Sequence, residues 1–141
     1  MAIVWFSLGS NLGNRAEYLN NAKKFIQQNI GDMLAESSVS ESEAVGFKGN
    51  NFLNQVIKVE TLLLPESVLQ KTEEIERSMG RTQKTIIKNG KPVYSNRTID
   101  IDILFYDDLQ IDTEILTIPH RRIWEREFLM KLLKEIHREE N

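Results

Sequence analysis

Two aspartates stand two residues apart in an apolar run of the chain. Asp100 and Asp102 alternate with isoleucines in the segment Thr98–Phe105, and this alternation is the period of a β-strand. Their side chains are therefore expected on one face, with the Cα atoms roughly 6–7 Å apart. Aspartate is uncommon in strands, and a buried charge is costly unless it is paired or binds a metal. The pair predicts a Mg²⁺ site of hard oxygen ligands. The alternative is an edge strand whose hydrated polar face pairs with Arg97.

Cationic side chains lie on both sides of this strand in the sequence. Arg81 follows Gly80, and Arg97 precedes the aspartates. A second group follows Pro119 and comprises His120, Arg121, Arg122 and Arg126. Guanidinium groups match phosphate oxygens in a bidentate manner. Together with the aspartates, these residues indicate a phosphate group held by a metal ion.

Each candidate also has an ordinary structural interpretation. Arg81 suits a helix C-terminus, where cations are favoured. Arg126 suits the solvated face of a helix, and His120 suits a turn after a proline. Glu76 suits an ion pair with Arg77 or Lys71. The sequence leaves these alternatives open.

Length and composition limit the class of protein. The chain has 141 residues, which predicts a single domain over 1–141. It has no cysteine, so disulfides and thiolate chemistry are excluded. The apolar start is short and lacks a basic leader, and no apolar run is long enough to span a bilayer, so we expect a soluble cytoplasmic protein with no membrane partner. A net charge of −3 argues against general nucleic-acid binding. We expect a monomer.

The apolar periodicity predicts an α+β fold of the ferredoxin-like βαββαβ type, an antiparallel sheet with helices on one face. Helices are expected after Asn14 and from Pro65, with stops at Gly31 and Gly80, and from about 122 to 135. Strands are expected at 3–8, 33–41, 52–62, 99–105 and 109–111. A polar loop is expected at 42–51 and a long basic loop at 82–96, and loops of that length are usually functional or disordered.

Two other classes of protein compete at this point. A ferredoxin-like module that binds RNA is disfavoured by the acidic charge and by the absence of an aromatic RNA-binding strand motif. A two-metal phosphodiesterase or cyclase would act on a nucleotide alone. The segment Leu8–Gly13 lacks the ending of a Walker loop, and no Rossmann fingerprint is present.

Several segments together resemble one family, the 6-hydroxymethyl-7,8-dihydropterin pyrophosphokinases of folate biosynthesis. The matching segments occur in family order across nearly the whole length, and they are Leu8–Gly13, Phe52–Val56, Glu76, Gly80–Arg81, Arg97–Leu104, Leu116–His120, Arg126 and Phe128. The run Arg97–Ile103 followed by Ile118–His120 is highly specific. The resemblance implies a kinase in which a pterin hydroxymethyl oxygen attacks the β-phosphorus of ATP and AMP leaves.

The resemblance also implies roles for individual residues. Arg81, Arg97, Asp100 and Asp102 would be catalytic, with the two aspartates holding two Mg²⁺ ions. The nucleotide would be bound by Glu76, Arg81, Ile103, Thr117, His120, Arg121 and Arg126. The pterin would be bound by Ser42, Val45, Phe52, Asn54 and Phe128, with its ring between the two phenylalanines.

Three departures from the family pattern are visible. The loop after Arg81 is longer than is common and offers Gln83, Lys84 and Tyr94 in place of a tryptophan and a second arginine. Arg121 stands where an aromatic residue is common beside the nucleotide. The chain ends soon after its last predicted helix. These departures concern affinity and loop closure rather than the reaction.

Overall fold

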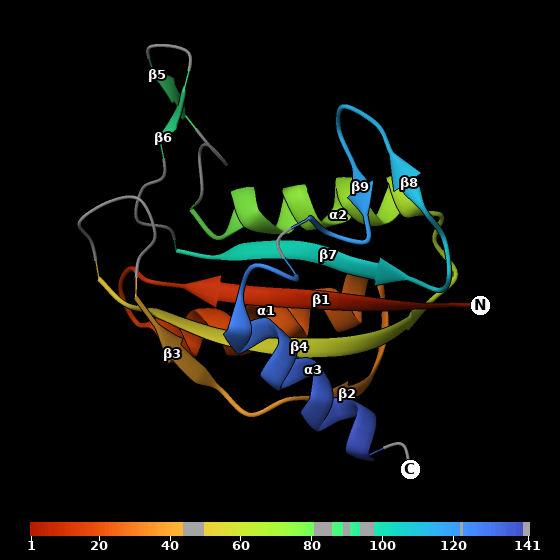
Figure 1. Ribbon diagram of the computed structural model, residues 1–141, viewed down its shortest axis with the longest axis horizontal. Coiled ribbons are helices and arrows are strands. Elements are labelled where there is room, and N and C mark those ends of the chain that lie inside the picture. The colour runs from red at the N-terminus through yellow and green to blue at the C-terminus, as the bar shows by residue number, and fades with distance from the viewer. Residues whose placement is uncertain (44–49, 81–85, 89–90, 94–97, 122, 140–141) are drawn as a thin grey trace.

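The computed structural model describes residues 1–43, 50–80, 86–88, 91–93, 98–121 and 123–139 (Figure 1). Its elements are β1 (Ala2–Ser10), α1 (Arg15–Asn29), β2 (Gly31–Glu36), β3 (Ser40–Ser42), β4 (Phe52–Thr61), α2 (Pro65–Ser78), β5 (Ile86–Lys88), β6 (Lys91–Val93), β7 (Asp100–Tyr106), β8 (Ile111–Asp112), β9 (Thr117–Ile118) and α3 (Glu127–Glu139). Up to Tyr106 the longer elements follow the order β-α-β-β-α-β, which confirms the predicted fold class, and α3 is added after them. Within the described ranges, the helices are too short or too polar to cross a membrane.

One antiparallel sheet lies at the centre, with the strand order β2-β4-β1-β7, and β3 pairs with the start of β4. β1 lies between β4 and β7, and its Val4, Phe6 and Leu8 side chains are fully buried. In the described part of the chain β7 pairs with β1 alone. Its outer edge therefore offers backbone groups to other elements.

Helices cover both faces of the sheet. Figure 1 shows α1 and α2 behind the sheet and α3 in front of it. The cluster on the side of α1 and α2 includes Phe6, Ile26 and Ile75, and the cluster under α3 includes Val56 and Leu129. The sequence predicts helices on one face only. α3 covers part of the second face because its apolar stripe has to be buried.

The predicted start and end of α1 are confirmed, and the glycine at its end is also part of β2. The Asn14 side chain accepts a hydrogen bond from the Glu17 backbone N–H at 3.2 Å and so caps the helix. Gly31 follows the helix, as predicted, but it is also the first residue of β2. A Cβ at Gly31 would collide with the backbone carbonyl of Glu60 in β4. The pairing of β2 with β4 therefore requires glycine at this position.

Several predicted elements differ from the structure. The predicted strand 33–41 is divided into β2 and β3, with residues 37–39 between them. The predicted loop 82–96 contains two short paired strands, β5 and β6, whose β-branched residues favour strand. The predicted strand 109–111 begins only at Ile111, where it pairs with Ile118 of β9. The last helix begins at Glu127 rather than near 122. Ile123 is fully buried, and its backbone N–H bonds to the His120 carbonyl at 3.3 Å, so this stretch turns before the helix starts.

The end of β7 remote from the aspartates is anchored to the connection between β4 and α2. The Tyr106 hydroxyl donates to the Leu63 carbonyl oxygen at 2.7 Å. Burial of the ring, and then the nearby Asp107 carboxylate, raise the pKa of this hydroxyl above its ordinary value. The neutral hydroxyl therefore persists to higher pH than in an exposed tyrosine and keeps its bond to Leu63.

Candidate active site

The two aspartates of β7 face the side of the sheet that α3 covers in part. Ile99, Ile101 and Ile103 belong to the cluster under α1 and α2. Asp100 and Asp102 alternate with them and so face the opposite side, as the sequence predicted. The Asp102 side chain is 17% exposed. The structure thus has two carboxylates on one face of an edge strand.

A row of three residues crosses the sheet at the start of β7. Gly9 of β1 is in register with Asn54 of β4 on one side and with Asp100 of β7 on the other. Neighbouring strands lie about 4.8 Å apart, so the Asn54 and Asp100 backbones are about 10 Å apart. A Cβ at Gly9 would lie 3.5 Å from Asn54 Oδ1 and 3.5 Å from a carbon of the Phe52 ring. Glycine leaves this space open between the candidate pterin residues and the aspartate.

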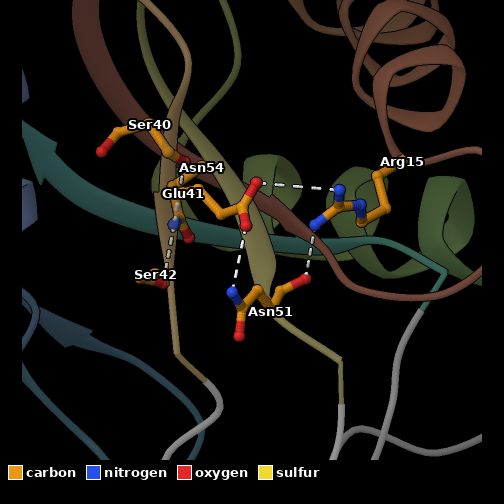
Figure 2. Close-up of polar contacts among 6 residues, drawn as sticks. All are labelled: Arg15, Ser40, Glu41, Ser42, Asn51 and Asn54. Carbon is orange, nitrogen blue, oxygen red and sulfur yellow. Dashed lines mark hydrogen bonds and ion pairs between the residues drawn. The ribbon is translucent and has the colours of Figure 1, made fainter.

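The predicted pterin residues that the structure describes come from β3, β4 and α3. Asn54 is 5% exposed, and its Nδ2 donates to the Ser40 carbonyl at 3.2 Å and to Ser42 Oγ at 2.8 Å (Figure 2). These bonds leave Asn54 Oδ1 directed toward the space above Gly9. Phe52 is partly exposed, and Phe128 packs against the cluster under α3, on the same face as the aspartates.

Two contacts hold the outer edge of β7. Glu76 of α2 is 4% exposed, and its carboxylate accepts a hydrogen bond at 2.8 Å from the backbone N–H of Ile101. The His120 backbone N–H donates to the Leu104 carbonyl at 3.0 Å. The second contact brings the imidazole to the strand, where Nε2 lies 3.9 Å from Asp102 Oδ1. The edge of β7 is thus bonded to α2 at Ile101 and to the turn after β9 at Leu104.

A pocket of about 570 Å³ lies along this edge. It is bounded by α2 through Leu69 and Glu73, by β7, and by the segment that contains β8 and β9. Four predicted nucleotide residues line it together with Asp102, and they are Ile103, Thr117, His120 and Arg121. Figure 1 shows α2, β7 and the β8–β9 hairpin next to one another. One of the two aspartates therefore lines the same pocket as the candidate nucleotide residues.

The predicted cationic residues are brought together only in part. Arg121 is 75% exposed at its side chain and pairs with Asp112 of β8 at 3.4 Å. Arg126 is partly exposed and directly precedes α3. Arg81 and Arg97 lie outside the described residues, as does Val45 of the candidate pterin set. Their predicted roles stay predictions.

The residues present fit a magnesium site of a particular kind. Within the described ranges, His, Cys, Asp and Glu side chains form no group of three or more that would hold a metal alone. Mg²⁺ in phosphoryl-transfer sites is commonly held by one or two carboxylates and completed by substrate phosphates and water. Two aspartates on one face, one of them lining the pocket, supply the protein's share of such a site.

The structure adds pocket residues that the sequence interpretation missed. Leu69 and Glu73 line the pocket from α2. With Glu76 they have the spacing i, i+4 and i+7, which places them along one side of a helix. That spacing was a usable signal. Residues 113–116 also line the pocket, and their connecting segment carries no comparable periodic signal.

Comparison with known proteins identifies the family of this chain. Residues 5–138 match the family 7,8-dihydro-6-hydroxymethylpterin-pyrophosphokinase (HPPK). A 2-amino-4-hydroxy-6-hydroxymethyldihydropteridine pyrophosphokinase of Porphyromonas gingivalis is 41% identical over 138 residues, covering 96% of this chain and 91% of the relative. Enzymes of the same name from Aquifex aeolicus and Bacillus subtilis are 38% and 35% identical, and this chain covers 81% and 77% of their lengths.

Solved structures agree on the fold. An HPPK-DHPS in complex with substrates superposes with a TM-score of 0.69 at 14% identity, over 96% of this chain and 40% of that one. A wild-type Plasmodium falciparum HPPK-DHPS with pteroate gives a TM-score of 0.71 at 15% identity, over 94% of this chain and 38% of that one. This chain thus spans about 40% of those longer chains. From the family match and the near-full-length relatives, the chain belongs to the 7,8-dihydro-6-hydroxymethylpterin pyrophosphokinase (HPPK) family.

Proposed function

We propose that Asp100 and Asp102 hold Mg²⁺ for the reaction that family membership assigns to this chain. That reaction transfers pyrophosphate from ATP to the hydroxymethyl group of 6-hydroxymethyl-7,8-dihydropterin, releases AMP and belongs to folate biosynthesis. Bound Mg²⁺ would neutralise charge on the triphosphate and orient the attacking and leaving oxygens. The number of ions, two, is part of the proposal.

One observation carries the assignment of the site. The aspartates lie between two candidate substrate regions: Asp100 is in the row with Gly9 and Asn54, and Asp102 lines the pocket beside β7. A transfer between two substrates requires the reacting groups to meet. Positioning and charge neutralisation supply most of the rate enhancement in phosphoryl transfer.

On the pterin side, we assign Asn54 Oδ1 to accept a hydrogen bond from the pterin edge. Ser42 fixes the Asn54 amide through its hydroxyl. Phe52 and Phe128 would hold the flat ring from two sides, as stacked aromatic groups prefer. Val45 is kept as a further pterin contact on the strength of the family resemblance.

On the nucleotide side, the pocket residues Ile103, Thr117, His120 and Arg121 would bind ATP. His120 holds a fixed place beside Asp102 because its backbone bonds to β7. Glu76, Arg81, Arg97 and Arg126 complete the proposed nucleotide and phosphate contacts. Arg81 and Arg97 would stabilise the negative charge that the transferred group carries.

The products of the reaction test the proposal. We incubate the protein with ATP, Mg²⁺ and the hydroxymethyl dihydropterin and separate the nucleotides. AMP is expected to accumulate in step with pterin consumption. ADP as the main product would refute attack at the β-phosphorus. Nucleotide turnover that is independent of pterin would instead favour a phosphodiesterase or cyclase.

Two further parts of the proposal have their own measurements. Titration of Mg²⁺ in the presence of a non-hydrolysable ATP analogue counts the ions, and a single ion at saturation would contradict the two-metal arrangement. We also propose that the chain acts as a monomer. Light scattering after size exclusion measures its mass in solution, and a dimer mass would contradict this.

A further inference from the structure

The start of α1 is tied to the approach to β4 by contacts that the proposed roles do not use (Figure 2). Arg15 Nη1 donates to the Asn51 carbonyl oxygen at 2.8 Å, and Arg15 Nη2 lies 3.8 Å from Glu41 Oε1. Glu41 Oε2 accepts from Asn51 Nδ2 at 3.0 Å. Arg15, Glu41 and Asn51 form a closed ring of contacts, which is named the Arg15 brace here.

The brace is adjacent to the proposed pterin residues in both strands it joins. Asn51 directly precedes Phe52 in the chain. Glu41 lies in β3 between Ser40 and Ser42, the two residues that accept hydrogen bonds from the Asn54 amide. Figure 2 shows the Asn54 contacts next to the brace, with Arg15 reaching from α1 toward Glu41 and Asn51. A movement of β3 relative to β4 would therefore change the direction of the Asn54 amide.

β3 is anchored on its N-terminal side, where the Ser37 backbone N–H donates to the Val56 carbonyl of β4 at 2.8 Å, and the brace acts further along the strand at Glu41. β3 is three residues long, and in the described part of the chain it pairs with β4 alone. One more contact supports the same region: Asn11 Nδ2 donates to the Asn50 carbonyl at 3.1 Å. The turn after β1 and the first residue of α1 thus bind two consecutive carbonyls, those of Asn50 and Asn51, just before β4 begins.

The brace side chains are partly exposed, so the brace can position β3 without adding much to the stability of the whole protein. The Arg15 side chain is 31% exposed and the Glu41 side chain is 51% exposed. Ion pairs this exposed contribute little to the stability of a whole protein, because water screens the charges. Their contacts can still select one arrangement of a short strand.

We propose that Arg15 and Glu41 are positioning residues for the pterin pocket. They hold β3 against β4 so that the Asn54 amide keeps its bonds to Ser40 and Ser42 and presents Oδ1 to the pterin. Without the brace, the competent arrangement is populated less, and the apparent pterin affinity falls by the same factor. ATP binding stays unchanged, because the pocket beside β7 contains no brace residue. The inference rests on the proposed pterin pocket.

The test uses Arg15→Gln, Glu41→Gln and the double variant of the full chain. Pterin dissociation constants come from fluorescence titration in the presence of a non-hydrolysable ATP analogue, and ATP-analogue binding and Tm are measured alongside. Lys23→Gln is the matched control, since it removes another cation of α1 and breaks its ion pair with Glu36 at 3.3 Å. Asn54→Ala reports on the pocket itself.

Each brace variant is expected to raise the pterin Kd about five- to tenfold, with Tm within about 2 °C of the parent. The pterin Kd of the double variant is expected to be no higher than that of the more impaired single variant, because the two residues act as a unit. Arg15→Lys should recover part of the affinity, since lysine keeps the charge but lacks the planar fork. Lys23→Gln should bind pterin as the parent does.

Three outcomes would overturn the inference. A parent-like pterin Kd in both single variants, with Asn54→Ala impaired, refutes the brace and keeps the pocket. Parallel losses of Tm and of both ligands' affinities mean that the contacts serve the fold alone. A parent-like pterin Kd in Asn54→Ala refutes the pocket and the brace together.

Discussion

The Glu76 carboxylate accepts a hydrogen bond at 2.8 Å from the backbone N–H of Ile101, the residue between the two aspartates of β7. β7 is an edge strand of the described sheet, and no neighbouring strand accepts this N–H. The Glu76 carboxylate accepts it instead. Glu76 is 4% exposed and comes from α2. The contact fixes the position of the aspartate pair relative to the helix. This role is additional to the nucleotide contact proposed for Glu76.

Glu76→Ala is expected to leave the Ile101 N–H buried without its acceptor and to lower the free energy of unfolding by about 1–3 kcal/mol. The Mg²⁺ concentration for half-maximal activity should rise, because the aspartates lose their fixed position. Glu76→Gln keeps an oxygen acceptor and should retain most of the stability. Denaturant unfolding and Mg²⁺ titrations of both variants give the two quantities. Parent-like stability in Glu76→Ala would contradict the structural role.

Asp102→Asn keeps the size of the side chain and removes one charge from the proposed metal site. We expect turnover to fall by at least about 100-fold, which is about 3 kcal/mol of transition-state stabilisation. Stability in metal-free buffer should hold or rise slightly, since repulsion from Asp100 is relieved. The measurements are kcat at saturating Mg²⁺ and Tm without metal. Asp32→Asn, at an exposed position of β2, is the control. Near-normal turnover of Asp102→Asn would refute the metal assignment.

The shared face of Asp100 and Asp102 could be predicted because it follows from the two-residue period of one strand. The row of Asn54, Gly9 and Asp100 could not, because it depends on the register of three strands that are distant in the sequence. The family resemblance predicted roles for Asn54 and Asp100 but not their relative positions.

Two other features that the sequence did not predict also depend on contacts between residues distant in the sequence. Gly31 was predicted from local pattern as a helix stop, whereas its close approach to Glu60 in another strand is a tertiary contact. The Arg15 contact to Asn51 joins residues 36 positions apart, so no local pattern marks it. The last helix was predicted from about 122, whereas in the structure Ile123 is buried in a turn before α3 begins.

Asn54→Ala removes both the proposed pterin acceptor and the local bonds to Ser40 and Ser42. We expect weaker pterin binding by about 1–3 kcal/mol, because buried polar groups of the pterin lose their partner. Some loss of Tm should accompany it. Phe128→Ala should weaken pterin binding by removing a stacking face, with no effect on the Asn54 bonds. Calorimetric titrations with pterin and with an ATP analogue, beside melting curves, measure these effects. Loss of Tm alone in Asn54→Ala would mean that this amide only supports β3.

Gly9 and Gly31 offer a matched pair of glycine substitutions in one sheet. At Gly9 a methyl group meets Asn54 Oδ1 and the Phe52 ring at ordinary contact distance, 3.5 Å, so Gly9→Ala is expected to fold with parent-like Tm. The methyl group occupies the space between Asn54 and Asp100, however, and the pterin Kd should rise about tenfold or more, at least 1.4 kcal/mol.

At Gly31 the methyl group meets the backbone of Glu60, which cannot rotate away as a flexible side chain can. Gly31→Ala should therefore lower the free energy of unfolding by about 1–3 kcal/mol, as overpacking does. The folded fraction should bind pterin with parent-like affinity, because Gly31 lies at the opposite end of β4 from Asn54, in register with Thr61. Tm and pterin titrations on both variants test the contrast. If Gly9→Ala binds pterin as tightly as the parent does, the space above Gly9 is not the pterin site.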